Sequence, residues 1–123
     1  FGGRKATTYR DITDGTSNTY LLGEKYCDPD HYEDGLVAYD DQGWNIGWDW
    51  DTVRWCNNNI DYQPLQDQAG YDRGRAFGSA HANGFHMAFC DGSVQFINYS
   101  IDREIHNYLG NRHDDMVIDG KAF

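Results

Sequence analysis

Hydrophobic and polar residues alternate most clearly on either side of the dipeptide Asp91-Gly92. Asp-Gly favours a tight two-residue hairpin turn because both positions accept positive φ angles. The sequence therefore predicts a β-hairpin centred on this dipeptide. The expected pairs are Cys90 with Ser93, Phe89 with Val94, Ala88 with Gln95, Met87 with Phe96, and His86 with Ile97.

One face of this hairpin is expected to be buried, because Met87, Phe89 and Phe96 would share it. His86 would lie on the other, more mixed face. A slip of one residue would turn these apolar side chains to solvent, so we expect the pairing to be well specified. An irregular loop ahead of the hairpin carries His81.

Weaker patterns predict several further elements. Ile101, Ile105 and Leu109 recur at four-residue spacing, which indicates a short helix with Ser100 as its N-cap and Gly110 at its end. Antiparallel hairpin signals together with one short helix indicate an α+β fold. A buried strand is expected at Thr19–Leu22 that ends near Glu24-Lys25, with further short strands at Leu36–Tyr39 and Met116–Ile118. A long surface loop is expected at Pro64–Gly74.

The composition fits a single domain over residues 1–123, with a core built from few but large side chains. Hydrophobic residues make up 39% of the chain and aromatic residues 15%. The formal net charge of -10 argues against nucleic acid and anionic membrane surfaces as partners, because both are themselves negatively charged. No apolar run approaches the length needed to span a membrane.

Four carboxylates lie within seven residues of one loop: Asp28, Asp30, Glu33 and Asp34. Calcium binds several hard oxygen ligands on a flexible loop, so this segment is the candidate calcium site. It does not match an EF-hand, because Tyr32 stands where an acid would be needed. The alternative is a solvated acidic loop without a metal, and no other cofactor is expected.

All four tryptophans lie within one short segment, at Trp44, Trp48, Trp50 and Trp55. Alternation around Trp48 and Trp50 would place both rings on one face. The cluster could offer a stacking platform for sugar rings. The other interpretation is packing in the core or between subunits, because each ring buries a large area.

Ser79, His81, His86 and Asp91 are residue types found in hydrolase sites, but no nucleophile elbow surrounds the serine. The turn already explains Asp91. We therefore expect no catalytic residues. His81 is expected to form hydrogen bonds that fasten the preceding loop to the hairpin turn.

The segments FGSAH and FCDGSVQFI, with nine residues between His81 and Asp91-Gly92, resemble a family of planctomycete surface proteins of uncharacterised function. The segments DGTSNTYLLGEK, WDWDTVRW and INYSID match as well. Members of that family typically begin with a prepilin-type cleavage and methylation segment and are regarded as pseudopilin-like. The resemblance implies that His81, Asp91 and Gly92 are motif residues, and it carries no established catalytic chemistry.

The resemblance also implies a pilin-like fold, in which an antiparallel β-sheet head follows a long N-terminal helix. That helix is absent here, so we expect residues 1–123 to be the C-terminal part of a longer protein. The expected location is extracellular or at the cell surface, on the periplasmic side of the envelope before assembly. In that oxidising setting Cys27 and Cys56 would form a disulfide, leaving Cys90 as a buried free thiol. The alternative is three reduced cysteines.

The expected function is structural: a non-enzymatic, pseudopilin-like subunit of an extracellular filament or envelope secretion apparatus. Such a subunit forms a homo-oligomer and meets the membrane only through the missing helix. The alternative is an extracytoplasmic module that binds carbohydrate or a small solute through the Trp44–Trp55 segment. Assembly predicts an exposed apolar strip, whereas solute binding predicts a concave pocket with exposed tryptophans.

Overall fold

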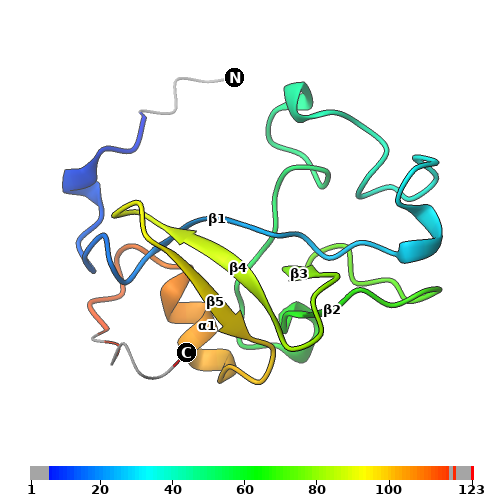
Figure 1. The fold of residues 1–123 in the computed structure, drawn as a ribbon. Helices are drawn as coiled ribbons and strands as arrows, with labels where there is room; N and C mark the ends of the chain where they lie inside the picture. The colour runs from blue at the N-terminus through cyan, green and yellow to red at the C-terminus, as the bar shows by residue number, and fades with distance from the viewer. Residues whose placement is uncertain (1–5, 117, 119–122) are drawn as a thin grey trace.

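The computed structural model describes residues 6–116, 118 and 123 (Figure 1). Short 3-10 helices, small strands and one α-helix are separated by long loops. In chain order the elements are η1 (Tyr9–Asp11), β1 (Tyr20–Gly23), η2 (Pro29–His31), η3 (Trp44–Ile46), η4 (Ile60–Tyr62), β2 (Leu65–Gln66), β3 (Gly78–Ser79), β4 (Gly84–Phe89), β5 (Val94–Asn98) and α1 (Arg103–Leu109).

The main sheet is antiparallel and has three strands in the order β1-β4-β5. Strands β2 and β3 form a separate parallel pair. An antiparallel sheet with one short C-terminal helix confirms the predicted α+β class. Among the described residues, no helix is long and apolar enough to cross a membrane.

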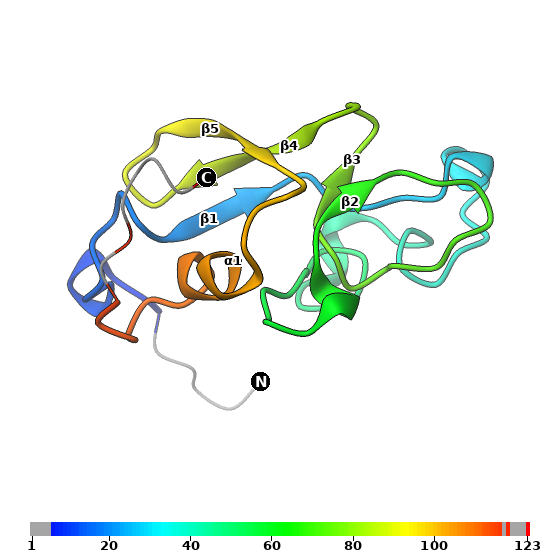
Figure 2. The ribbon, with the colours of Figure 1, turned by 90° about the horizontal axis from the view of Figure 1, so that it is seen from below.

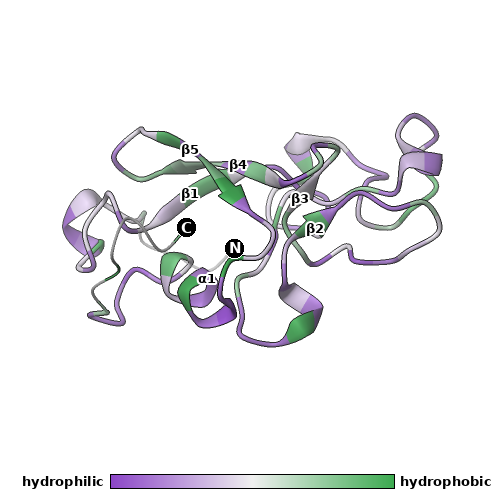
Figure 3. Ribbon diagram, turned by 60° about the horizontal axis from the view of Figure 1, so that its bottom comes forward, coloured by the Kyte–Doolittle hydropathy of each residue, from purple (hydrophilic) through white to green (hydrophobic). Residues whose placement is uncertain are grey.

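The core lies between the main sheet and α1. Phe85, Met87 and Phe89 occupy every second position of β4, and all three are fully buried. They form one buried cluster with Ile97 from β5, with Ile101 just before α1 and with Leu109 from α1. Figure 2 shows α1 on one side of the sheet, and Figure 3 shows the hydrophobic stretches of the two elements. Each such side chain contributes about 1.5–3 kcal/mol when it leaves water, so this face holds the sheet and helix together.

The hairpin forms where the sequence predicts it, but the predicted register is wrong by one residue. In the structure Phe85 pairs with Ile97, His86 with Phe96, Met87 with Gln95, and Ala88 with Val94. The inward face of β4 is as expected, whereas Phe96 points outward and is 47% exposed. The shift has turned the side chains of β5 to the opposite faces.

The turn explains this difference. Gly92 has a φ of 86°, while Asp91 keeps a negative φ, so the two-residue turn with two positive angles is not formed. Gly92 N–H donates to the carbonyl of Phe89 at 2.9 Å, and Phe89 N–H donates to the carbonyl of Ser93 at 2.8 Å. These bonds describe a three-residue loop with a glycine bulge, which adds one residue to the connection.

The predicted strand at Thr19–Leu22 forms as β1, but its expected burial is wrong. Thr19 is buried, whereas Leu21 and Leu22 are 60% and 67% exposed. The strand lies at the edge of the sheet, and its register shifts between Tyr20 and Leu22. Among the described residues, no helix covers the face of the sheet that Leu22 occupies, so a leucine there remains in water.

The predicted helix is present but starts two residues later than expected. Asp102, not Ser100, is its N-cap, because its carboxylate accepts hydrogen bonds from the backbone N–H groups of Glu104 and Ile105. Ile101 and Leu109 are buried, as the apolar stripe predicts. Gly110 follows the last helical residue.

Of the two remaining strand predictions, one is wrong and the other is not tested. Leu36–Tyr39 forms a turn instead, in which Asp40 N–H donates to the carbonyl of Val37. The side chain of Tyr39 is buried, so that segment is anchored by one aromatic ring. The predicted strand at Met116–Ile118 includes Val117, which lies outside the described residues.

The loops between β1 and β3 gather at one end of the sheet (Figure 1). Tyr26 is fully buried there, and its hydroxyl donates to the carbonyls of Gln68 and Tyr71. Asp28 is also buried and accepts a hydrogen bond from the backbone N–H of Gly70. The predicted surface loop at Pro64–Gly74 contains β2. The hydrogen bonds to Tyr26 and Asp28 attach this loop to the same region.

One titratable side chain lies inside the core. His106 on α1 is fully buried, its Nδ1 lies 3.3 Å from the hydroxyl of Tyr20, and its ring meets those of Phe77 and Phe85 edge-on. Burial lowers the pKa of His106 to about 4. The folded protein therefore keeps this imidazole neutral under conditions in which an exposed histidine would be charged.

This burial predicts a specific loss of stability in mild acid. Between about pH 6.5 and 4 the unfolded chain binds a proton that the folded chain excludes, so the free energy of unfolding falls as the pH falls through this window. The loss due to His106 is expected to reach about 2 kcal/mol at pH 5 relative to pH 7. Urea unfolding of the wild type and of His106→Leu at both pH values measures it. An equal pH dependence in the two proteins would contradict this assignment.

Candidate functional site

The outer face of the main sheet, which points away from α1, carries the most distinctive surface of the molecule. Since Phe85, Met87 and Phe89 point inward, the residues between them on β4, His86 and Ala88, point outward. Two rows cross the sheet on that face, according to the strand pairing. The first row is Leu22, Ala88 and Val94, and the second is Glu24, His86 and Phe96.

Most of this face is apolar and open to water. Leu22 is 67% exposed, Val94 65% and Phe96 47%, while Ala88 lies between them on the central strand. We call Leu22, Ala88, Val94 and Phe96 the outer strip. Scattered exposed apolar residues are ordinary, whereas a contiguous apolar group on one sheet face is a candidate interaction surface.

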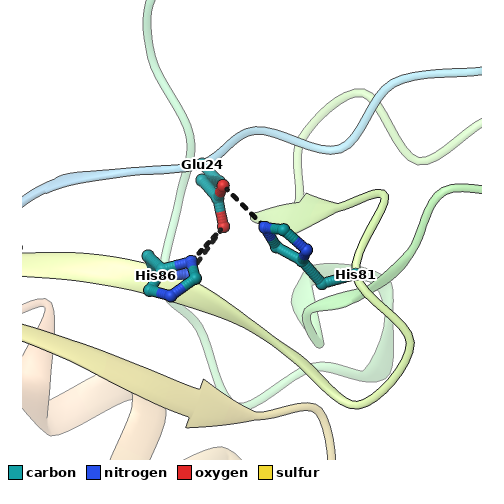
Figure 4. Close-up of side chains that lie close together, drawn as sticks. All are labelled: Glu24, His81 and His86. Carbon is teal, nitrogen blue, oxygen red and sulfur yellow. Dashed lines mark hydrogen bonds and ion pairs between the residues drawn. The ribbon is translucent and has the colours of Figure 1, made fainter.

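Three polar side chains adjoin the outer strip: Glu24, His81 and His86 (Figure 4). We call them the histidine cluster. The carboxylate of Glu24 lies between two imidazoles, with Oε1 3.5 Å from His81 Nε2 and Oε2 3.2 Å from His86 Nδ1. The two histidine rings meet edge-on with centroids 5.2 Å apart. All three side chains are partly exposed.

Three different segments hold this cluster in place. Glu24 directly follows β1, where its N–H donates to the carbonyl of His86 and its carbonyl accepts from the N–H of Gly78. His81 lies in the loop between β3 and β4. The hydroxyl of Tyr99 donates to the carbonyl of His81 at 2.8 Å, and the His81 N–H donates to Ser79 Oγ at 3.1 Å.

The other motif residues, Asp91 and Gly92, lie at the far end of β4 from His81. The predicted fastening of the His81 loop to the hairpin turn is therefore wrong, since β4 separates the two. The spacing of nine residues reflects the length of this strand and its flanking loops. The motif thus marks both ends of β4 and does not form one site.

Asp91 stabilises the turn through its own side chain. Its carboxylate accepts hydrogen bonds from the hydroxyl and backbone N–H of Ser93, and these bonds lower the pKa of Asp91. Its backbone N–H donates to the carbonyl of Thr16 at 2.9 Å. The turn is therefore attached to the loop that precedes β1, which is a structural role.

The four acids of the candidate calcium loop do not come together. Asp28 is buried and accepts from the backbone N–H groups of Asp30 and Gly70, while Asp34 pairs with His31 at 2.8 Å. Asp30 and Glu33 are exposed. Within the part of the chain that the structure describes, only the histidine cluster brings three possible metal ligands within 4.8 Å of one another.

The predicted Cys27–Cys56 disulfide is not formed, and all three cysteines are free thiols. Cys27 lies beside Asp67, which accepts its backbone N–H, whereas Cys56 packs against Gly110 after α1. The two residues therefore belong to different neighbourhoods. Cys90 is a buried free thiol, as predicted, and burial raises its pKa.

The tryptophan segment does not form a strand, and three of its four rings are well exposed. Trp44 is 89% exposed, Trp48 71% and Trp50 45%. The interpretation that these rings pack in the core of the chain is therefore wrong. Trp48 meets Trp55 edge-on at 6.5 Å. Packing between subunits and ligand binding both remain predictions for this segment.

A cavity of about 520 Å³ opens beside this segment, among the loops at one end of the sheet. Of the four tryptophans only Trp50 lines it, and the guanidinium of Arg75 lies 5.2 Å from the centre of that ring. Its wall includes aromatic and charged side chains: Tyr39, Trp50, Tyr71, Asp72, Arg73 and Arg75.

Comparison with known proteins places the chain in one family. Residues 1–104 match the family described as a protein of unknown function, DUF1559. The chain belongs to this family. No curated protein and no solved structure matches it. The match extends from the N-terminal segment to the first residues of α1, so it includes the whole main sheet with the outer strip and the histidine cluster.

Sequence reasoning located two members of the histidine cluster but missed their relation to each other. Alternation along β4 correctly placed His86 on the face opposite Met87. Glu24 was missed because it lies at the end of the predicted strand and belongs to no recognisable ligand spacing. Antiparallel pairing of that strand with β4 would have placed Glu24 opposite His86.

The turn geometry predicts the effect of changing Gly92. Nothing lies within 4 Å of a Cβ atom at this position, so Gly92→Ala tests the positive φ alone. Its free energy of unfolding is expected to fall by about 1–2 kcal/mol, whereas Gly92→Asn should lose less because asparagine tolerates the left-handed conformation. Urea unfolding compares the two variants. Equal stability of Gly92→Ala and the wild type would contradict the assigned turn.

Proposed function

We propose that this protein is a non-enzymatic, pseudopilin-like assembly subunit at the cell surface, and that the outer strip packs against a second copy. The observation that supports this function is the row of apolar side chains that crosses the sheet. Leu22, Ala88 and Val94 lie opposite one another on neighbouring strands, with two of the three well exposed. The resemblance to pilin-like surface proteins gives the same expectation.

A second copy fits this face better than a charged partner. The outer strip is apolar, and burying it removes hydrophobic area from water without burying unpaired charge. It reaches both edge strands, β1 and β5, so a neighbour can approach across the full width of the sheet. In a two-fold contact both subunits would use this same apolar face.

In this proposal the assembly is extracellular, and the resemblance to pilin-like proteins implies an N-terminal helix as the contact with the membrane. The sheet face would then supply contacts between heads, and the helix would supply contacts along a filament or pseudopilus. No catalytic residue is needed, because the role depends on surface shape and burial.

The outer strip is tested by replacing its two most exposed apolar side chains with polar ones. The double variant Leu22→Ser with Val94→Thr should keep the fold, since both side chains are exposed, and should weaken association of the heads. Sedimentation equilibrium over a range of concentrations measures the mass. The wild type is expected to rise above the monomer mass, and the variant is expected to stay monomeric.

The matched control is Leu36→Ser, which removes an equally apolar side chain that is 74% exposed and lies away from the sheet. It should associate like the wild type. A wild type that stays monomeric at every concentration would contradict the second-copy contact, and so would equal association of the wild type and the double variant.

The cavity beside Trp50 favours a second candidate function, the binding of carbohydrate or another small solute. Its wall combines aromatic rings with a few charged groups, as solute sites do. Screening on a glycan array would identify a ligand, followed by titration of Trp50→Ala. Affinity should fall roughly tenfold or more in this variant, as for other aromatic anchors. Trp44→Ala, which changes a ring outside the cavity, should bind normally, and a loss equal in both variants would contradict this function.

A further inference from the structure

We infer that the histidine cluster is a binding site for one divalent transition-metal ion of the zinc class. Glu24, His81 and His86 supply one carboxylate oxygen and two imidazole nitrogens, all within 4.8 Å of one another. This inference stands apart from the proposed assembly, because its three side chains come from a single chain.

The spacing of the ligand atoms suits a tetrahedral ion. With bonds of about 2.0–2.1 Å, neighbouring ligand atoms in a tetrahedral zinc site lie roughly 3.3 Å apart. The cluster shows 3.5 Å between Glu24 Oε1 and His81 Nε2, and 3.2 Å between Glu24 Oε2 and His86 Nδ1. Small side-chain rotations would let one carboxylate oxygen and both nitrogens face a common point.

The chemistry of the ligands selects the metal. Two imidazoles and one carboxylate suit zinc, copper, nickel or iron, whereas calcium and magnesium prefer oxygen ligands alone. Three protein ligands leave at least one position for water. That position would be accessible, since the side chains of His81, His86 and Glu24 are 55%, 47% and 38% exposed.

Hydrogen bonds and an aromatic contact already hold the three ligands in place. The carboxylate of Glu24 accepts the backbone N–H of His86 at 2.7 Å, which directs it toward the middle of the cluster. The ring of Phe96 meets that of His86 edge-on at 5.2 Å and restricts its rotation. Tyr99, through the carbonyl of His81, holds the loop that carries the third ligand. Outer contacts of this kind are typical of metal sites.

The His31–Asp34 pair offers a comparison within the same chain. It is also an exposed histidine beside a carboxylate, with Nδ1 and Oδ2 2.8 Å apart. Among the described residues it is not joined by a third ligand, so a single-site metal should not bind there. His31 therefore provides a matched control for the histidines of the cluster.

The test is a titration of the protein with Zn²⁺ by calorimetry and with Co²⁺ by visible absorption, at a protein concentration where it is monomeric. The wild type should bind one ion per chain. His81→Gln and His86→Gln should each weaken binding more than about tenfold, because even outer contacts of metal sites contribute 10–100-fold. His31→Gln should bind like the wild type. Acidification should release the ion, because protons compete for the same atoms.

Two further measurements keep the result unambiguous. Circular dichroism with a chelator present shows whether each variant is folded before metal is added. The absence of sulfur-to-cobalt absorption separates the histidine cluster from the free thiols. Failure of the folded wild type to bind either ion would overturn the inference. Undiminished binding by both His81→Gln and His86→Gln would overturn it as well, whatever the outcome of the association experiment.

Discussion

The structure depends on the burial of one face of β4. Phe85, Met87 and Phe89 are fully buried beneath the sheet, where they pack with Leu109 of α1. Because neighbouring side chains of a strand point to opposite faces, this burial directs His86 and Ala88 outward. The apolar core and the polar cluster are thus two consequences of the same alternation. A change that exchanged the faces of β4 would remove the core, the outer strip and the histidine cluster together.

The turn after β4 determines which residues of β5 lie beside His86 and Ala88 on the outer face. The glycine bulge at Gly92 shifts β5 by one residue relative to a two-residue turn, and this shift brings Val94 and Phe96 to the outside. As a result, the apolar side chains of Val94 and Phe96 remain exposed to water. The proposed contact with a second copy gives that surface a use, and the pairing of Phe96 with His86 connects it to the histidine cluster.

Much of the fold could be predicted from local pattern, and the rest depended on contacts between distant segments. Alternation found both strands of the hairpin, and four-residue spacing found α1. The register was missed because Asp91-Gly92 fits two turn types, which differ in hydrogen bonding more than in sequence. The exposure of Leu22 was missed, and that of Trp44 was left open, because hydrophobicity alone does not say whether another element covers a residue. Glu24 meets the two histidines only through strand pairing, which no residue spacing reveals.

The central claim is that the outer face of the sheet is an interface between subunits. Electron cryomicroscopy of the native material, without truncation or refolding, tests it most directly. The account predicts a regular assembly in which Leu22 and Val94 of each subunit are covered by a neighbouring subunit. Dispersed monomers would contradict it, and so would filaments in which this face remains open to solvent.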